Sequence, residues 1–221
     1  MKVCALIPAY NEASHIAAVA RGAAPHVAEV VVIDDGSTDG TCERAASAGA
    51  TCLRMPRNWG KATALRAGLE YAQSRGFTHV LTLDGDGQHL PDDIPALLGA
   101  RAADLVIGER SFDRASMPPS RYFSNTVGSK VASWLVGCEI RDSQSGFRLI
   151  RLEGLRGVRL RSRCYEFEME LLIKLARRGC TIGHAPVRAV YHAGQARSKM
   201  RPLRDTLRIC LWSLAFRFLR A

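Results

Sequence analysis

The sequence lacks the long apolar runs that a membrane-spanning helix requires. Nowhere do ~18 uncharged apolar residues follow one another. The apolar stretch within MKVCALIPAYNE (1–12) is also too short for the hydrophobic part of a secretory signal peptide. Internal repeats and low-complexity linkers are absent from the sequence too. We therefore expect neither a membrane-spanning segment nor an export signal.

Cysteine spacing in this chain is typical neither of a zinc site nor of a disulfide framework. The seven cysteines are an odd number, and no two of them form a Cys-x-x-Cys pair. Buried free thiols are the usual state of cysteine in a reducing cytoplasm. We therefore expect free thiols and a cytoplasmic protein.

Acidic residues are few compared with basic ones. The formal net charge is +10 and the sequence pI is near 9.7, which suggests an anionic partner such as nucleic acid, a membrane surface or a phosphorylated small molecule. The chain has no helix-turn-helix or zinc signature and no aromatic residues interleaved along a basic sheet face. A nucleic-acid-binding module is therefore disfavoured, and we expect no nucleic acid as a partner.

Short β-rich runs alternate with helical patterns through the first half of the chain. The strand-like runs cover 3–7, 30–34, 50–54, 79–84 and 104–108, and the helical patterns cover 13–21, 41–48, 61–75 and 94–101. Buried parallel strands joined by crossover helices give this alternation. With 221 residues, of which 47% are hydrophobic, the chain can also bury a sizeable core. The sequence predicts an α/β fold with a doubly wound, mostly parallel sheet.

The second half of the chain has a different pattern. It predicts an amphipathic helix over 120–136, a turn at DSQSGFR (142–148), a helix over 167–178, two short strands within 181–191 and a basic amphipathic C-terminal helix. Glu166, Glu168 and Glu170 open the helix over 167–178, and basic residues close it. We interpret these acids as complements of the helix dipole rather than as catalytic groups.

Polar clusters follow four of the predicted strands. They are PAYNE (8–12), DDGSTDG (34–40), NWGK (58–61) and DGDGQ (84–88), and in a doubly wound sheet the ligand crevice lies beyond these carboxyl ends. An acid in DDGSTDG can accept hydrogen bonds from a ribose or a base edge, although a tight turn that caps the next helix accounts for the same motif. Lys61 stands at a helix start, where it can meet a phosphate or simply belong to the cap region.

The DGDGQ cluster has two interpretations. Asp84 and Asp86 flank a glycine, so both carboxylates can converge on one hard cation, with Gln88 adding an oxygen. Alternatively, these acids form an ordinary Asp-Gly turn, and the acids after Pro91 serve the N-terminus of the next helix. The motifs around the cluster favour the cation.

Seven motifs occur in one order along the chain: IPAYNE (7–12), VVIDDGSTDGT (31–41), NWGKATALRAGL (58–69), LDGDGQHLPDD (83–93), GER (108–110), DSQSGFRL (142–149) and FEMELLIKLARRG (167–179). This set resembles the family 2 inverting glycosyltransferases, and among them the dolichyl-phosphate mannose synthase and polyprenyl-phosphate glycosyltransferase branch. The resemblance extends from Val3 to about Lys199. It implies a GT-A-like nucleotide-sugar fold.

The resemblance also implies roles for individual residues. Nucleotide-sugar binding falls on Pro8, Tyr10, Glu12, Ile33, Asp35, Asp84 and Gly85, and Lys61 belongs to the same candidate set. The metal ligands are Asp84, Asp86 and Gln88, for Mg²⁺ or Mn²⁺. Asp86, Arg110 and Asp142 are the candidate catalytic residues, and Arg110, Arg148, Arg197 and Lys199 are expected to attract the substrate phosphates.

One segment departs from the family pattern. A closing loop of the type Arg-x-x-Gly-x-Ser-Lys is usual in the branch, whereas this chain has HAGQARSKM (192–200), with Ala193 and Ala196 in place of the arginine and the glycine. We expect a catalytic domain over 1–199 and a basic amphipathic helix over 200–221. That helix, assisted by 120–136, is expected to bind the inner face of the membrane peripherally.

The implied activity is metal-dependent, inverting transfer of a sugar from a nucleotide-diphosphate sugar to a polyprenyl phosphate. One alternative is a family 2 enzyme that uses a saccharide or another soluble acceptor. Another is a sugar nucleotidyltransferase, but the first strand leads to PAYNE rather than to a glycine-rich phosphate loop.

Overall fold

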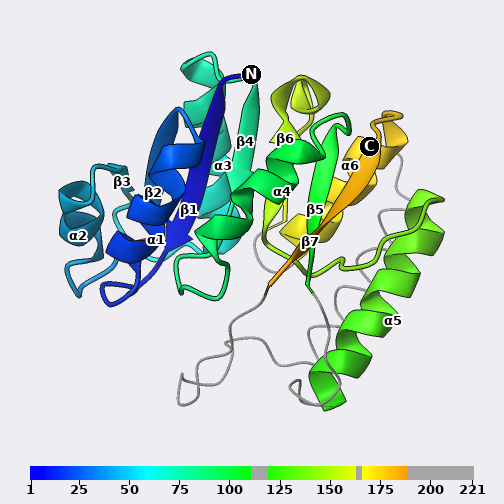
Figure 1. The fold of residues 1–221 in the computed structure, drawn as a ribbon, viewed down its shortest axis with the longest axis horizontal. Helices are drawn as coiled ribbons and strands as arrows, with labels where there is room; N and C mark the ends of the chain where they lie inside the picture. The colour runs from blue at the N-terminus through cyan, green and yellow to red at the C-terminus, as the bar shows by residue number, and fades with distance from the viewer. Residues whose placement is uncertain (111–118, 163–165, 189–221) are drawn as a thin grey trace.

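The computed structural model describes residues 1–110, 119–162 and 166–188, which form one seven-stranded sheet with helices on both faces (Figure 1). The strands are β1 (Val3–Ala9), β2 (Glu29–Asp34), β3 (Thr51–Arg54), β4 (His79–Thr82), β5 (Leu105–Arg110), β6 (Arg148–Arg151) and β7 (Ile182–Val187). The α-helices are α1 (Ile16–Ala23), α2 (Thr41–Ser47), α3 (Lys61–Ser74), α4 (Ile94–Gly99), α5 (Pro119–Val136) and α6 (Phe167–Arg177). Short 3-10 helices occur at η1 (Ala24–His26), η2 (Pro91–Asp93) and η3 (Leu152–Leu155).

The sheet is parallel except at one strand. Its order is β3-β2-β1-β4-β6-β5-β7. β6 runs antiparallel to both β4 and β5, whereas the other pairs are parallel. The doubly wound, mostly parallel sheet is therefore confirmed, but β6 was not expected. Its RLIR sequence is too short to stand out from the turn before it.

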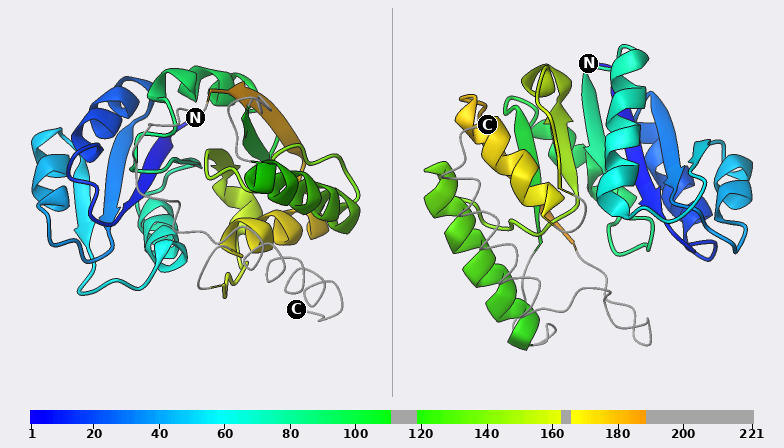
Figure 2. Two further views of the ribbon diagram at one scale, coloured as in Figure 1. Left: turned by 90° about the horizontal axis from the view of Figure 1, so that it is seen from below. Right: turned by 180° about the vertical axis from the view of Figure 1, so that it is seen from behind.

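Alternate side chains of the strands face opposite layers of helices. In β1, Cys4 and Leu6 belong to the apolar cluster shared with α3 and α6, whereas Ala5 and Ile7 belong to the cluster shared with α1 and α4. A strand buried on both faces has this two-sided apolar pattern. Figure 2 shows the sheet between the two helical layers.

A glycine permits close packing on the α3 side. A Cβ at Gly68 of α3 would lie 2.9 Å from side-chain carbons of Ile33 and Leu6, which is closer than real contacts allow. The absence of a side chain there lets α3 sit directly on β1 and β2. This packing fixes where the N-terminus of α3, with Lys61, meets the edge of the sheet.

Most predicted elements of the first half are confirmed. Each of the five predicted strands overlaps an observed strand, and the four helical patterns overlap α1 to α4. The helices over 120–136 and 167–178 correspond to α5 and α6. Of the two strands expected within 181–191, β7 is present, while 189–191 fall outside the described residues. The C-terminal helix over 200–221 and the domain boundary at 199 also fall outside them.

The expectation of free thiols is wrong for one pair. Cys42 at the start of α2 and Cys52 in β3 form a disulfide, with their Cα atoms 5.8 Å apart. The packing of α2 on the edge of the sheet brings them together, and their spacing in the sequence does not reveal this. Cys4, Cys138 and Cys180 are free thiols, as expected, but the burial expected of such thiols holds only for Cys4, since Cys138 is exposed and Cys180 is half-buried. Within the described ranges, no helix is long and apolar enough to cross a membrane.

Candidate active site

The carboxyl ends of the parallel strands, with the loops that follow them, form one rim of the sheet. The two loops that follow β1 and β2 on this rim hold each other in place. Asn11 has a left-handed backbone, with φ of 56°, a conformation that asparagine tolerates better than most residues. Residues 11–13 are tied to the turn over 34–41 by four hydrogen bonds. These run from Asn11 N to Ser37 Oγ (2.9 Å), Thr38 N to Asn11 Oδ1 (3.0 Å), Glu12 N to Thr41 Oγ1 (2.9 Å) and Ala13 N to Asp39 Oδ2 (3.0 Å). The half-buried side chains of Tyr10 and Glu12 are thus carried on a fixed loop.

The predicted nucleotide residue Asp35 is used to hold a loop. Its carboxylate oxygens accept hydrogen bonds from the backbone N–H groups of Trp59 and Gly60, both at 2.8 Å. Asp35 therefore connects the DDGSTDG turn to the NWGK loop. Ile33 is fully buried in the core, so its side chain supports the floor of this region from below. Pro8 is half-buried at the end of β1.

Lys61 points to acids rather than outward to solvent. Its Nζ lies 2.7 Å from Oδ1 of Asp84 and 3.0 Å from Oε1 of Glu168, which stands in the first turn of α6. Gly146 closes over this cluster, because a Cβ there would lie 2.9 Å from the Lys61 ammonium. The NWGK, DGDGQ and DSQSGFR motifs and α6 therefore meet at one point.

His89 positions the backbone of Asp84. Its Nδ1 accepts the N–H of Asp84 at 3.1 Å, and its ring stacks on Phe147 with the centroids 5.1 Å apart. Burial lowers the pKa of His89 from its ordinary value, although the charge of Asp84 opposes this. The imidazole is therefore a neutral acceptor whose ring is fixed by packing.

The charges around Asp84 keep it ionised. Desolvation would raise the pKa of Asp84, but the charges of Lys61 and Arg110 together with the Lys61 hydrogen bond hold it well below its usual range. Desolvation likewise opposes the charge of Lys61, yet Asp84 and Glu168 raise the pKa of Lys61. This part of the rim is a fixed set of charges at neutral pH.

The rest of the DGDGQ motif forms a tight turn beside this cluster. Gln88 N donates to Oδ1 of Asp86 at 3.0 Å, and Gly87 has a positive φ of 77°. Gly85 is packed close to Pro8, since a Cβ there would lie 3.3 Å from the Pro8 carbonyl oxygen. The turn offers carboxylate and amide oxygens, the donor set that Mg²⁺ and Mn²⁺ prefer. Its chemistry therefore fits the expected cation.

Arg110 and Asp142 form a bidentate pair. Nε of Arg110 lies 2.7 Å from Oδ2 of Asp142, and Nη2 lies 3.0 Å from Oδ1. The side chain of Asp142 is fully buried, whereas that of Arg110 is 19% exposed. Asp142 therefore fixes the guanidinium of Arg110 at the carboxyl end of β5. A carboxylate held in this way is poorly placed to take a proton from a substrate.

Arg148 faces the interior of the protein and not a substrate. It is 1% exposed, and its guanidinium donates to the carbonyl oxygens of Ser145 (2.8 Å), Glu168 (2.7 Å) and Ser143 (2.7 Å). It holds the DSQSGF turn against the start of α6. We therefore correct the expectation that Arg148 attracts a substrate phosphate: its donors are occupied by the backbone.

Sequence reasoning missed two residues of this site. Glu168 was interpreted as a dipole complement, yet its carboxylate contacts Lys61. The role of His89 was also missed, because nothing in the sequence links it to the N–H of Asp84. For His89, the available signal in the sequence was its place directly after the DGDGQ motif. No feature of the sequence pointed to a contact of Glu168 with Lys61. Arg197 and Lys199 lie outside the described residues.

Comparisons with known proteins agree on one family. The sequence model described as "Glycosyl transferase family 2" matches residues 4–157. An undecaprenyl-phosphate mannosyltransferase from Micrococcus luteus is 33% identical, over 85% of this chain and 83% of the relative. A polyprenol monophosphomannose synthase from Mycolicibacterium smegmatis is 29% identical, over 82% of this chain and 75% of the relative.

Solved structures show the same fold. Glucosyl-3-phosphoglycerate synthase from Mycobacterium tuberculosis in complex with uridine diphosphate superposes with a TM-score of 0.75 at 22% identity, covering 100% of this chain and 81% of that one. The same enzyme has been solved with Mn²⁺, UDP-glucose and phosphoglyceric acid, and this complex superposes with a TM-score of 0.71.

Proposed function

The chain belongs to glycosyl transferase family 2, and from this premise we propose that it is a nucleotide-sugar-dependent glycosyltransferase that transfers one sugar to a polyprenyl phosphate with inversion at the anomeric carbon. The observation that carries the acceptor class is the buried Arg110–Asp142 pair. Two relatives named for transfer to undecaprenyl phosphate and polyprenol phosphate support the same class.

The nature of the acceptor follows from the state of Asp142. A sugar hydroxyl must lose a proton as it attacks, so a hydroxyl acceptor needs a nearby base. A phosphomonoester has a second pKa of about 6 and is already largely ionised near neutral pH. Because Asp142 is buried and bound by two nitrogen atoms of Arg110, it is suited to positioning. An acceptor that needs no base fits this site better.

On the donor side, the chain binds and orients the nucleotide diphosphate. Tyr10 and Glu12, on the loop fixed by the turn over 34–41, are proposed to contact the nucleoside, with Asp35 holding the NWGK loop in place beside them. Lys61 and Glu168 orient Asp84. Asp86 and Gln88, with Asp84, would hold Mg²⁺ or Mn²⁺, which supplies charge neutralisation at the diphosphate leaving group.

On the acceptor side, Arg110 is proposed to bind the phosphate of the acceptor. Its guanidinium is fixed by Asp142 and still 19% exposed, so it can receive an anion without reorganising. Fixed donors aimed at developing charge are a large source of catalysis. Arg197 and Lys199, which lie outside the described residues, are proposed to add to this positive charge.

A lipid acceptor places the enzyme at a membrane surface, and α5 has an exposed face suited to it. Phe123 and Trp134 are 61% and 58% exposed, and they lie three helical turns apart on one side of α5. Lys130, also exposed, lies between them. Aromatic and basic side chains together favour an anionic lipid interface. We propose that α5 contacts the inner face of the membrane, together with the segment over 200–221.

Transfer of label from a radioactive nucleotide sugar tests the proposal. The purified chain, Mn²⁺ and a panel of nucleotide sugars are incubated with a short polyprenyl phosphate, with the matching polyprenol, or with free sugars. We expect label only in the polyprenyl phosphate, released by mild acid as the free sugar. Label in free sugars, with none in the lipid, would instead favour the family 2 enzyme with a soluble acceptor.

A further inference from the structure

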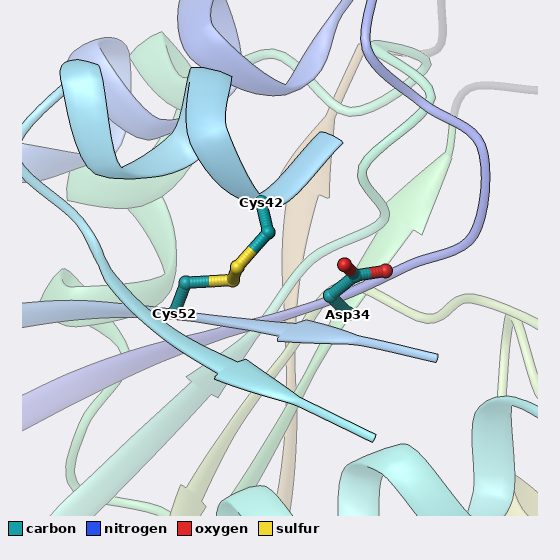
Figure 3. A group of neighbouring side chains, drawn as sticks. All are labelled: Asp34, Cys42 and Cys52. Atoms are coloured by element: carbon teal, nitrogen blue, oxygen red, sulfur yellow. A yellow bond between two sulfur atoms is a disulfide. The ribbon is translucent and has the colours of Figure 1, made fainter. Parts of the chain in front are cut away.

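Three potential ligand atoms lie together beside the nucleotide side of the rim. Cys42 comes from the start of α2, Cys52 from β3 and Asp34 from the end of β2 (Figure 3). Their two sulfur atoms and a carboxylate oxygen all lie within 4.8 Å of one another. The two sulfur atoms form a disulfide in this structure. Three different elements thus converge on one point at the edge of the sheet.

Asp34 has capacity left for a further bond. Its side chain is fully buried, and it accepts hydrogen bonds from the N–H of Ser37 (2.8 Å, Oδ1) and from Nε of Arg54 (3.2 Å, Oδ2). An ionised carboxylate offers about four acceptor positions, so these two bonds leave it able to bind a cation. A buried acid within 4.8 Å of a disulfide gains no hydrogen bond from the sulfur atoms, which are weak acceptors and carry no proton to donate.

We propose that, when the disulfide is reduced, Asp34, Cys42 and Cys52 form a second metal site, selective for a thiophilic divalent cation such as Zn²⁺. Reduction by a low-molecular-weight thiol consumes two thiols, yields their disulfide and leaves two protein thiols. Binding of the cation then releases two protons as both thiols become thiolates. The covalent S–S bond and the bound cation are alternative states of one site.

The dimensions of the cluster suit a tetrahedral cation. Zinc takes sulfur at about 2.3 Å and carboxylate oxygen at about 2.0–2.2 Å, so its ligand atoms lie about 3.5–3.8 Å apart. The ligand atoms lie within 4.8 Å of one another, so a shift of about 1 Å brings the carboxylate oxygen and a sulfur atom to that spacing. The two sulfur atoms separate to the same spacing once their bond is broken. Both cysteines are partly exposed, which leaves room for a water molecule as the fourth ligand.

Charge and ligand type separate this site from the DGDGQ turn. Two thiolates, Asp34 and Glu43 supply four negative charges, and a divalent cation with Arg54, which bridges the two acids (2.7 Å to Glu43), supplies three positive ones. The set is thus close to neutral with the cation bound. Thiolates select zinc over magnesium, whereas the carboxylate and amide oxygens of DGDGQ are ligands suited to magnesium and manganese. Each site therefore prefers a different metal.

The location gives the site a structural purpose. Thr41, which precedes Cys42, accepts the N–H of Glu12 in the loop proposed to contact the nucleoside. A bond that connects α2 to β3 and β2 therefore also fixes Thr41, and through Thr41 it stabilises the loop that carries Glu12. In a reducing environment the S–S bond is lost, and the bound cation replaces it as the link between the same three elements.

Cobalt(II) is a direct probe, because thiolate ligation gives an intense near-ultraviolet charge-transfer band that oxygen ligation does not. The full chain is reduced, freed of reductant under anaerobic conditions and titrated with Co²⁺. We expect the band in the reduced protein, its displacement by Zn²⁺, and no band in the oxidised protein. Cys42→Ser and Cys52→Ser should abolish it. Asp34→Asn should weaken Co²⁺ affinity at least about tenfold, since even outer-shell partners of a metal are worth that much.

Matched variants locate the signal. Cys138→Ser removes an exposed free thiol, and Asp86→Ala alters the oxygen-ligand turn; both should keep the band. No band in the reduced wild type, a band that survives in both Cys42→Ser and Cys52→Ser, or unchanged affinity in Asp34→Asn would each overturn the proposal. Thermal melts verify that every variant is folded. The test uses neither donor nor acceptor, so its outcome is independent of the proposed activity.

Discussion

Individual acids at the rim differ in what they contact, and their expected roles follow from those contacts. Asp84 contacts Lys61, Asp86 accepts a hydrogen bond from the backbone N–H of Gln88 in its own turn, and Asp142 is enclosed with Arg110. Asp35 is engaged by backbone N–H groups. Substitution of each acid should therefore produce a different defect, even though all four lie at the same rim of the sheet.

Replacing Asp86 by alanine should abolish transfer without unfolding the protein. The side chain lies in a half-buried turn and packs in neither apolar cluster, so the variant loses a proposed metal ligand without losing a contact of the hydrophobic core. Mn²⁺ binding, followed by electron paramagnetic resonance, and label transfer should fall together. Asp92→Ala, which removes an exposed acid from the same loop, is the control. Near wild-type turnover of the Asp86 variant in chelator-treated buffer would contradict the metal assignment.

Replacing Asp142 by asparagine should leave measurable transfer to polyprenyl phosphate. Asparagine can still accept one hydrogen bond from Arg110, so the expected loss is about tenfold, the worth of one charge-assisted bond of ~1.5 kcal/mol. The slope of the pH–rate profile should be unchanged. Glu139→Gln, which alters an exposed acid in the neighbouring loop, serves as control. A loss of ~10²-fold or more is typical of a missing general base and would refute the positioning role.

Two helices connect the site to the rest of the molecule in different ways. α6 starts in the site with Glu168 and, through Glu170, anchors the segment before it, where the N–H groups of Arg161 and Ser162 donate to the Glu170 carboxylate at 2.7–2.9 Å. α5 carries exposed aromatic residues along its outer face. The first helix is therefore expected to affect stability, and the second is expected to affect where the enzyme acts.

Glu170 should make stability depend on pH in the acid range. Desolvation raises its pKa, but bonds from Lys174, Ser162 and Arg161 outweigh this and lower the pKa below the ordinary value of 4.5. A lowered pKa means that the unfolded chain binds the proton more tightly, so this stabilisation is complete above about pH 4.5 and is lost as pH falls through the folded pKa.

Glu170→Gln should remove the pH-dependent stabilisation that the Glu170 carboxylate provides. Urea unfolding between pH 3 and pH 6 should show a smaller rise of the unfolding free energy with pH in the variant than in the wild type. Glu153→Gln, which alters an exposed acid paired with Arg156, should keep the wild-type slope. Parallel curves for Glu170→Gln and the wild type would show that the carboxylate does not titrate as described.

The exposed aromatic residues of α5 should drive membrane binding. Phe123→Ser combined with Trp134→Ser should lower partition into anionic liposomes at least about tenfold, because a large apolar side chain gains ~1.5–3 kcal/mol on burial. Sedimentation with liposomes measures it. Trp59→Ser removes an exposed tryptophan of the NWGK loop instead and should sediment like the wild type. Equal sedimentation of the α5 variant would exclude this face as a lipid contact.

Over the whole molecule, the basic charge is not spread evenly along the sequence. The segment after Arg201 contains Arg204, Arg208, Arg217 and Arg220 but only one acid, Asp205. An anionic leaflet attracts each nearby basic residue by about 1 kcal/mol. The net charge of +10 and the proposed lipid acceptor therefore point to the same surface.

Truncation after Arg201 should release the protein from anionic liposomes at low salt and weaken use of a long-chain acceptor. Nucleotide binding, measured by calorimetry, should be unchanged, because the proposed nucleotide contacts lie between Pro8 and Glu168. An unfolded truncated protein, or a full chain that fails to sediment, would mean that this segment belongs to the core. Repeating the liposome sedimentation at high salt distinguishes electrostatic attraction from apolar insertion, since only the electrostatic contribution to binding is screened by salt.

The sequence by itself determined the order of strands and helices in the first half and the motifs that follow each strand. These depend on local periodicity and on turn residues, which a single stretch of chain carries in full. It also determined the edge of the sheet at which the motifs meet, because parallel strands present their carboxyl ends together. The place of DGDGQ in the site followed from that rule, whereas the place of GER was implied by the resemblance to family 2 glycosyltransferases.

Only the tertiary structure decided which side chains contact each other within the site. The Lys61–Glu168 contact, the enclosure of Asp142 by Arg110, the inward direction of Arg148 and the Cys42–Cys52 pair all join segments that are separate in the sequence. The insertion of β6 between β4 and β5 brings the DSQSGF turn and α6 to the rim. Such contacts depend on strand pairing and helix packing, and therefore on the chain as a whole, so no local pattern encodes them.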